Sequence, residues 1–278
     1  MRVSHLPFKC NRGGGRFGQG KLVFGLASLL LCLATLELAS SALPARVETT
    51  QFLPPGTVIP VRLDGTLEVN AAQAQHQIEA RVAQEVPLAG KEKISLRSRV
   101  LATVTTVSPG ADGTVKLSFK FDHLEEKDQT YPIVASLRAL ASYRAVRNAQ
   151  MPLTGADAGT SAGWGTTVQI GGDQRFGDGG KVRNRHKQTV GKAVRGGVLV
   201  RLAANLDRGC AGPEASEDRL QATWVFSADA CGVYDMKNVK IAQNGKSDPL
   251  GVITLEFAKD DMKLESGAAF LLRILQKR

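Results

Sequence analysis

The 278-residue sequence predicts an all-β fold, and two observations carry this prediction. Apolar and polar residues alternate in several short segments, most clearly in residues 114–121 (TVKLSFKF). A period of two is typical of a strand with one buried and one solvated face. Turn-forming residues separate these segments, as at Pro54-Pro55-Gly56 and Asp112-Gly113. Short strands divided by such turns are typical of a barrel or a sandwich.

The first part of the predicted sheet ends near residue 140. In its first strand, Ile59, Val61 and Leu63 alternate with residues that we assign to a solvated face. The Asp112-Gly113 step between two strands predicts a hairpin. Charges such as Lys116 on the outward face would be costly in hydrocarbon, so this barrel is expected to lie in water. The expected strands are residues 57–63, 78–86, 94–107, 114–121 and 131–140.

Residues 141–197 have a different composition. Nine glycines fall within the 26 residues from Gly155 to Gly180, which leaves little capacity to form a core. We expect a long excursion or a layer of loops over the domain, anchored by Trp164 and residues 168–170. Trp164 is a candidate ligand contact, because exposed aromatic side chains on loops are often functional.

Regular patterning returns in residues 198–278. Trp224 shares one face of an expected strand with core residues, which predicts that it is buried. The last apolar run is apolar on both faces apart from Arg273, so we expect a buried strand that completes the same domain. The expected strands are residues 198–203, 220–227, 239–243, 250–257 and 268–275.

The first 42 residues have the pattern of a secretory signal peptide. A basic region ends at Lys21, an apolar run follows from Leu22 to Leu36, and small residues come next. The expected cleavage lies between Ala42 and Leu43, which predicts a periplasmic or secreted protein. The alternative is an uncleaved signal anchor, which would be the chain's one attachment to a membrane.

Only two cysteines follow this segment, Cys210 and Cys231, which are 21 positions apart. In an exported protein such a pair is expected to form a disulfide. Two buried free thiols are the alternative. A zinc site is not indicated, because neither cysteine belongs to a close Cys-x-x-Cys pair.

The charge does not indicate a nucleic-acid binder. The net charge of +10 is raised by the first 42 residues, which carry five basic residues and one acidic residue. Aromatic residues make up 5% of the chain, and basic residues do not gather in a stripe with aromatic residues between them. We therefore expect no nucleic-acid partner.

The sequence contains no convincing catalytic or metal-binding motif. His76, His123 and His186 have no second ligand type at metal-binding spacing, and no Gly-x-Ser-x-Gly elbow occurs. A single calcium ion held by Asp173 and Asp178 is an alternative to this interpretation. We predict a protein that is not an enzyme and that uses no cofactor and no metal.

Residues 52–140 resemble a known family. The segments PGTVIPVRLDGTL from Pro55, QIEARVAQEVPLAG from Gln77, TVKLSFKFDHL and QTYPI are similar to the TrbI-like β-barrel of conjugative type IV secretion systems. The chain departs from the family where a strand should open with Ile-Pro-x-Gly-Ser. Ser95 and Arg97 replace the proline and glycine, whereas Ser98 is retained, so we expect this turn to be built differently.

The resemblance implies a soluble TrbI-like β-barrel with additional strands and a glycine-rich insertion. The whole layout is also similar to uncharacterised secreted bacterial proteins, which suggest no activity. The second apolar helix of a secretion-channel subunit is missing, so the resemblance supports a fold more than a secretion role. The expected organisation is a signal peptide at 1–42, a barrel core at 43–140, the glycine-rich excursion at 141–197 and a C-terminal β segment at 198–278.

The function expected from these observations is a non-enzymatic cell-envelope module that binds protein or assembles with itself. Its edge strands and residues 141–197 would be the contact surfaces. The alternative is a periplasmic ligand-binding module, for carbohydrate if Trp164 lines a groove. A hydrolase is a third hypothesis, which requires a cleft with a nucleophile and a base.

Overall fold

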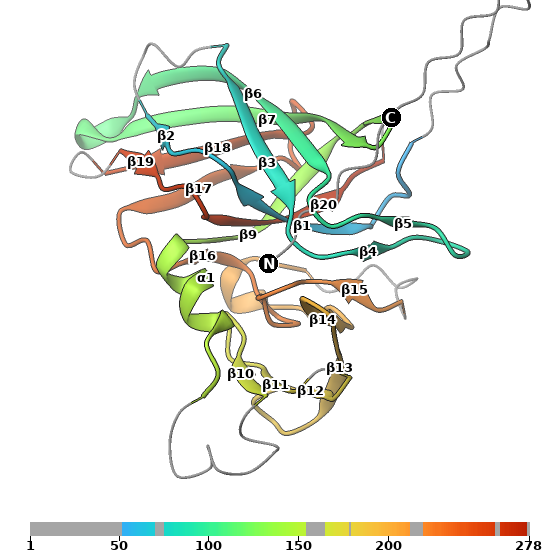
Figure 1. Ribbon diagram of the computed structural model, residues 1–278. Coiled ribbons are helices and arrows are strands. Elements are labelled where there is room, and N and C mark those ends of the chain that lie inside the picture. The colour runs from blue at the N-terminus through green and yellow to red at the C-terminus, as the bar shows by residue number, and fades with distance from the viewer. Residues whose placement is uncertain are drawn as a thin grey trace, which may run out of the picture. The chain divides into compact units, whose positions relative to one another are not determined.

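The computed structural model describes residues 52–69, 75–153, 165–177, 179–211, 219–258 and 262–276. Strands are the main regular structure of these residues, with one α-helix among them, α1 (Tyr143–Gln150) (Figure 1). The all-β class predicted from the sequence is therefore confirmed. Among the same residues, no helix has both the length and the apolar character needed to cross a membrane.

The larger of two main sheets has ten strands. Its neighbours pair in the order β16-β9-β20-β1-β3-β6-β7-β18-β17, and β8 pairs with β7 beside this path. Every pair is antiparallel except β16 with β9, which is parallel. The strands are β1 (Val58–Leu63), β3 (Gln77–Val82), β6 (Arg99–Pro109), β7 (Val115–Glu126), β8 (Gln129–Pro132), β9 (Ala135–Ala141), β16 (Gly232–Tyr234), β17 (Val239–Asn244), β18 (Val252–Phe257) and β20 (Ala269–Ile274).

Two short ladders extend this part of the molecule. β2 (Leu67–Glu68) pairs with β19 (Lys263–Leu264), and β4 (Val86–Pro87) pairs with β5 (Lys93–Ile94). The β4–β5 hairpin follows β3 directly and later forms one side of the candidate site.

The long hairpin of β6 and β7 has the turn that its sequence predicts. A short 3-10 turn spans Ala111–Gly113 between the two strands. Asp112 has φ 55° and Gly113 has φ 76°, both in the left-handed region, which aspartate tolerates and glycine favours. The hairpin expected from the Asp-Gly step is therefore present.

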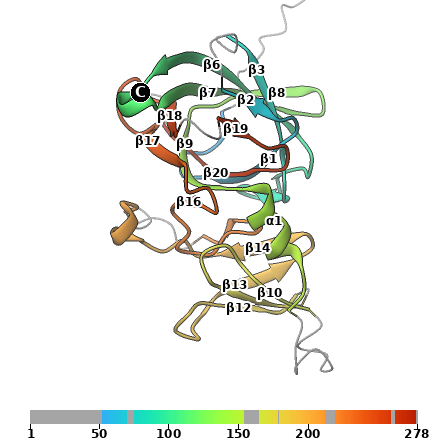
Figure 2. The same ribbon diagram turned by 90° about the vertical axis from the view of Figure 1, so that its left-hand side faces the viewer.

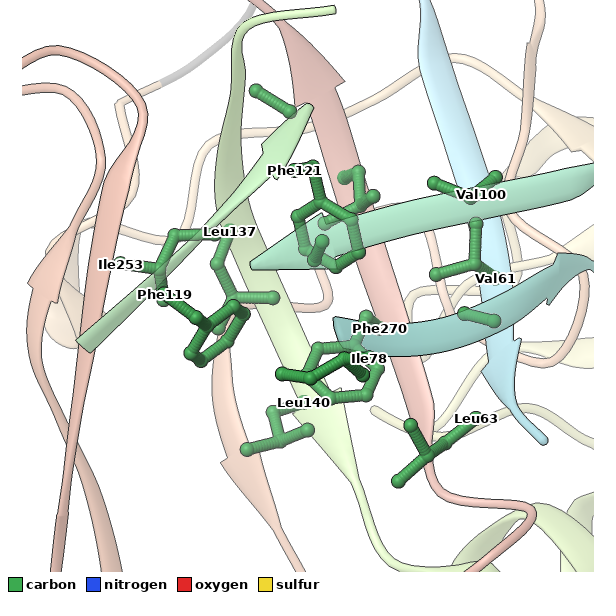
Figure 3. Close-up of a cluster of buried hydrophobic side chains, with 14 of the residues drawn as sticks. Val61, Leu63, Ile78, Val100, Phe119, Phe121, Leu137, Leu140, Ile253 and Phe270 are labelled. Atoms are coloured by element: carbon green, nitrogen blue, oxygen red, sulfur yellow. The ribbon is translucent and has the colours of Figure 1, made fainter. Parts of the chain in front are cut away.

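The large sheet curls around one hydrophobic core. Phe119, Phe121 and Phe270 meet there in edge-to-face pairs, with ring centroids 5.8 to 6.2 Å apart (Figure 3). The alternating apolar residues of the sheet supply this core, because successive side chains of a strand point to opposite faces. Other side chains in it include Val61, Leu63, Ile78, Val100, Leu137, Leu140 and Ile253.

Glycine allows the two ends of the curled sheet to approach each other. Gly245 lies between β17 and β18 with φ 88°, and a Cβ atom there would be 2.9 Å from the carbonyl oxygen of Ala135 in β9. A side chain at position 245 would therefore clash with backbone. No ladder joins β17 to β9 in the part of the chain that the structure describes.

The smaller sheet has six antiparallel strands in sequence order. They are β10 (Thr166–Val168), β11 (Gln174–Phe176), β12 (Lys181–Arg183), β13 (Thr189–Val194), β14 (Gly197–Val200) and β15 (Gln221–Ala222). The described residues of the predicted glycine-rich excursion are thus mostly helix and strand, and not a layer of loops. Figures 1 and 2 show this sheet together on one side of the large sheet.

A second hydrophobic cluster lies between the two sheets. Val58, Ala139 and Leu271 turn their side chains away from the first core, and they are buried against Trp224 and Phe226. The solvated face expected for residues 57–63 is therefore wrong at Val58 and Pro60, which are both buried, and correct at Arg62, which is exposed. This second contact explains why the last strand is apolar on both faces.

The strand expected at 220–227 is shorter than predicted. Only Gln221 and Ala222 are in strand conformation, because Thr223 to Phe226 form a turn. The N–H of Phe226 donates to the carbonyl of Thr223 over 2.9 Å, and Trp224 has φ 55°. The predicted burial of Trp224 is correct, since its side chain packs between the sheets.

Candidate functional site

Of the residues predicted as sites, the two cysteines are described. Cys210 and Cys231 form a disulfide with their Cα atoms 6.1 Å apart, in agreement with the predicted pairing. The bond joins the loop after a 3-10 turn at Leu206–Arg208 to the residue that precedes β16. The predicted cleavage residues Ala42 and Leu43 and the predicted ligand contact Trp164 lie outside the described residues.

A cleft of about 740 Å³ lies between the two sheets. One side comes from β1, β3 and the β4–β5 hairpin, and the other comes from the β13–β14 turn. Trp224 and Gln84 also line it, and both are almost fully buried. We call this space the inter-sheet cleft.

Gln84 joins the two sides of the cleft through hydrogen bonds of its side-chain amide. Its Oε1 accepts hydrogen bonds from the N–H groups of Val198, over 3.1 Å, and Trp224, over 2.7 Å. Its Nε2 donates to the carbonyl of Val198 over 2.8 Å. Gly197 makes room for this contact, because a Cβ atom there would lie 2.1 Å from the Gln84 Oε1. A buried amide with these partners is well satisfied and holds the β14 and Trp224 backbones beside the end of β3.

The charge of the inter-sheet cleft is strongly positive. Six cationic and two acidic side chains line it. Lys93 is bonded to Glu85 over 2.7 Å, and Arg81 is bonded to Asp64 and Glu79, which lie outside the lining. The other four cations are exposed and have no carboxylate partner among the residues described: Arg62, Lys91, Arg97 and Arg195.

Strand register explains why Arg62 is left unpaired. Arg62 in β1 faces Arg81 in β3, which in turn faces Arg99 in β6. Like charges directly opposite each other are unfavourable, and acids beside the row offset this cost. Glu79 bonds Arg81 over 3.1 Å and Arg99 over 2.9 Å, and the hydrogen bond from Arg99 lowers the pKa of Glu79 despite partial burial. Arg99 also bonds Glu125 over 2.7 Å, whereas Arg62 ends the row with no acid.

The turn before β6 presents another unpaired cation. The N–H of Ser98 donates to the carbonyl of Ser95 over 3.3 Å, and Arg97 has φ 72°. This is the left-handed conformation that glycine favours. The exposed side chain of Leu96 precedes it, at 53% accessibility.

Ser95 is where this turn differs from one with proline. Its N–H and hydroxyl donate to the carboxylate of Glu126 over 2.9 and 2.6 Å, and the Ser98 hydroxyl donates to the same group. Proline has no N–H and could not make the first of these bonds. Burial acts to raise the pKa of Glu126, but the bonds from Ser95 and Ser98 outweigh it and lower that pKa.

A second feature is the outer edge of β17, which faces β9 across a cleft of about 480 Å³ beside the disulfide. Lys240 and Ala242 are exposed on this strand, and a bulge interrupts its pairing with β18 between Ile241 and Gln243. Lysine and bulges are common on edge strands, because they discourage uncontrolled pairing.

The edges of the smaller sheet are partly occupied. The N–H of Leu153 donates to the carbonyl of Thr166 in β10 over 2.8 Å. At the other end, the side chain of Gln221 in β15 accepts from the N–H of Val58 over 3.2 Å. β17 has six residues and is longer than β10 or β15. Its edge is therefore the better candidate for the predicted contact with another strand.

Of the two predicted calcium ligands, Asp173 is among the described residues. Asp173 is buried and its Oδ2 accepts from the N–H of Ala228 over 2.8 Å, while Ser227 donates to Asp229 over 2.7 Å. Burial raises the pKa of Asp173 to about 6, and the nearby charge of Asp229 adds to this rise. Asp178 lies outside the described residues, in which no group of three or more metal-type ligands occurs.

The three histidines are not brought together in a site. His76 and His186 are exposed, and the Nε2 of His123 lies 3.6 Å from Glu125 on the large sheet. The inter-sheet cleft is not predicted from the sequence. Arg62 and Arg195 are far apart in the chain, and only the pairing of strands and the Gln84 contact bring their elements to one cleft.

Comparison with known proteins adds no relative: no family model, curated protein or solved structure matches this chain.

Proposed function

We propose that this chain is a non-enzymatic, exported module of the cell envelope that binds other protein or assembles with itself, on a TrbI-like barrel. The observation that carries this proposal is the edge of β17 that no ladder pairs among the described residues, which faces β9 across the smaller cleft. Six residues, Val239–Asn244, have a strand partner on one side only, and two of them are exposed. Such an edge offers backbone donors and acceptors to an extended segment of another chain.

Two further observations support an exported protein. The Cys210–Cys231 disulfide is compatible with an oxidising compartment, where such bonds persist. The pattern of the first 42 residues supports passage through a secretory route. The TrbI-like part of the proposal rests on the sequence motifs between residues 52 and 140.

The first test is the state of the native protein in the envelope fraction. Its intact mass should begin at Leu43 and be two hydrogens below that of the reduced chain. A native gel should show oligomers or complexes above the monomer. A full-length mass in the membrane fraction would instead indicate a signal anchor, and a strictly monomeric species without partners would contradict the assembly proposal.

The second test blocks the β17 edge. Ala242→Lys places an additional charge on an exposed edge position, which should remove the higher species if they depend on strand pairing. Ala111→Lys, at an exposed position in the β6–β7 turn, adds the same charge elsewhere and should leave them unchanged. Equal loss in both variants would show that net charge and not the edge is responsible.

A further inference from the structure

We propose that the inter-sheet cleft binds an extended acidic segment of a partner protein. This inference rests on the proposed function, because it takes the partner to be a protein. It assigns to the cleft a contact that is separate from the β17 edge, since no residue lines both clefts.

The unpaired cations indicate an anionic ligand. Arg62 comes from β1, Lys91 from the β4–β5 turn, Arg97 from the turn before β6 and Arg195 from the β13–β14 turn. They therefore border the cleft from both sheets, and none has a carboxylate partner among the described residues. Charges of one sign around a cleft reinforce one another and attract a ligand of the opposite sign.

Apolar side chains between these cations indicate that the ligand is a polypeptide. Leu88 and Leu199 are half-buried in the lining, and Leu96 is 53% exposed next to Arg97. A segment with acidic and apolar residues in alternation could place carboxylates at the cations and side chains on the leucines. A free phosphate or a sugar phosphate would leave the apolar part of the surface uncovered.

The other polar groups of the lining argue against a small buried anion. Gln84 is the buried polar side chain there, and both of its functional ends are already engaged with backbone groups of Val198 and Trp224. No spare buried donor is available from it. Recognition must therefore come from the exposed cations, which suits a ligand that spans several of them.

Nucleic acid fits this lining less well. Single-stranded nucleic acids stack their bases on exposed aromatic side chains. The aromatic residue in the lining is Trp224, which is only 5% exposed.

Two lining residues have unfavourable backbone conformations. Arg97 has φ 72° and Trp224 has φ 55°, a region that residues with side chains rarely adopt. Such strain is more frequent at binding sites than elsewhere, because it fixes the direction of a chain. In the inter-sheet cleft, the two residues with these conformations are Arg97, in the turn before β6, and Trp224, in the turn after β15.

The test measures the affinity of the oxidised mature chain for a labelled peptide by fluorescence anisotropy. The probe is Gly-Ser-Glu-Leu-Glu-Val-Glu-Leu-Glu-Ser-Gly, and its control has glutamine in place of every glutamate. We expect the acidic peptide to bind at least about tenfold more tightly, with an affinity that falls as salt is added. Equal affinity for the two peptides, or no binding of the acidic one, would overturn the proposal.

Matched variants locate the binding. Arg62→Gln/Arg195→Gln removes one unpaired cation from each side of the cleft and should weaken the acidic peptide by about tenfold, the order expected when two charge contacts are lost. Lys181→Gln/Lys192→Gln removes the same charge from exposed residues that face each other on β12 and β13. This control should change the affinity by less than about twofold, because neither lysine lines the cleft.

Two outcomes would assign the cleft differently. Equal weakening by both double variants would mean a general effect of net charge, which overturns a site in the cleft. Tighter binding of a labelled oligothymidine than of the acidic peptide would replace protein with nucleic acid. Envelope complexes that persist and depend on Ala242 while the peptide fails to bind would overturn this inference and leave the proposed function intact.

Discussion

The buried carboxylate of Asp173 makes the stability of this protein depend on pH. Its carboxylate is enclosed beside Asp229 and receives a hydrogen bond from the Ala228 N–H. Burial raises its pKa from 3.8 to about 6, so the folded chain holds this proton more tightly than the unfolded chain. The ionised form therefore costs stability near neutral pH, and protonation between about pH 6 and pH 4 removes that cost.

We therefore expect Asp173→Asn to stabilise the protein at pH 7.5 by up to about 3 kcal/mol, since each unit of pKa shift corresponds to about 1.4 kcal/mol. The amide can still accept from the Ala228 N–H. The advantage should disappear as the pH falls to 4, and urea unfolding at both values checks this. Asp207→Asn, at an exposed position, is the control and should show no such dependence. An unchanged stability of Asp173→Asn at pH 7.5 would contradict the cost of the buried charge.

At the scale of elements, Glu126 at the end of β7 holds the turn between β5 and β6. It receives three donors from Ser95 and Ser98, and it is 9% exposed. Because hydrogen bonds to a charged group contribute about 1.5–3 kcal/mol when an unpaired group would remain, the turn depends strongly on this residue.

Glu126→Ala should lower the free energy of unfolding by about 2 kcal/mol, the size expected for lost hydrogen bonds to a charged group. Glu92→Ala on the neighbouring hairpin removes an exposed acid that makes no ion pair with a described residue, so it should change stability by less than about 0.5 kcal/mol. Urea unfolding measures both. A loss in Glu126→Ala no larger than in the control would mean that the turn is held by its backbone alone.

The elements that the sequence predicted well are those long enough for a period of two to be visible. β1, β7, β17 and β20 lie within one or two residues of their expected start. The expected strand at 131–140 covers two, β8 and β9, because the chain leaves the ladder at residues 133 and 134.

The smaller sheet could not be predicted in the same way. β10, β11 and β12 have three residues each, which is too short for a period to stand out from neighbouring glycines. In the expected strand at 220–227 the period of two is genuine in the sequence, but Trp224 reverses the chain with φ 55°. Tertiary packing between the sheets holds that turn, and no local signal indicates it.

The candidate site could be predicted only in part. The disulfide follows from the two cysteines that come after residue 42, because these two allow only one pairing. The unpaired state of Arg62 depends on its register against Arg81, which the sequence does not show. The sequence also does not show that the Gln84 side chain bonds the carbonyl of Val198, which is 114 positions away. This bond brings the β13–β14 turn to the cleft.

At the scale of the whole molecule, the disulfide constrains the chain where the two sheets adjoin. Cys210 follows the smaller sheet's β14 and precedes β15, whereas Cys231 directly precedes β16 of the large sheet. The closed loop spans 21 positions, which restricts the unfolded chain.

Cys210→Ala/Cys231→Ala should lose about 3 kcal/mol of stability, the value that the chain-entropy model gives for a loop of this length. Comparison of its urea unfolding with that of the oxidised chain of residues 43–278 measures the loss. The oxidised chain should also show no free thiol after unfolding. Two reactive thiols per chain would contradict the bond, and equal stability would mean that the cross-link adds strain that cancels its benefit.

The position of β20 has a consequence for how the molecule comes into being. β20 lies between β1 and β9, so it joins these two strands of the large sheet, and it contributes Phe270 to the core. A ribosome delivers these residues only after it has synthesised some two hundred positions that follow β1. Contacts this distant along a chain make folding slow. A chain cut just before β20 would leave the facing edges of β1 and β9 unpaired. We therefore expect such a chain to aggregate.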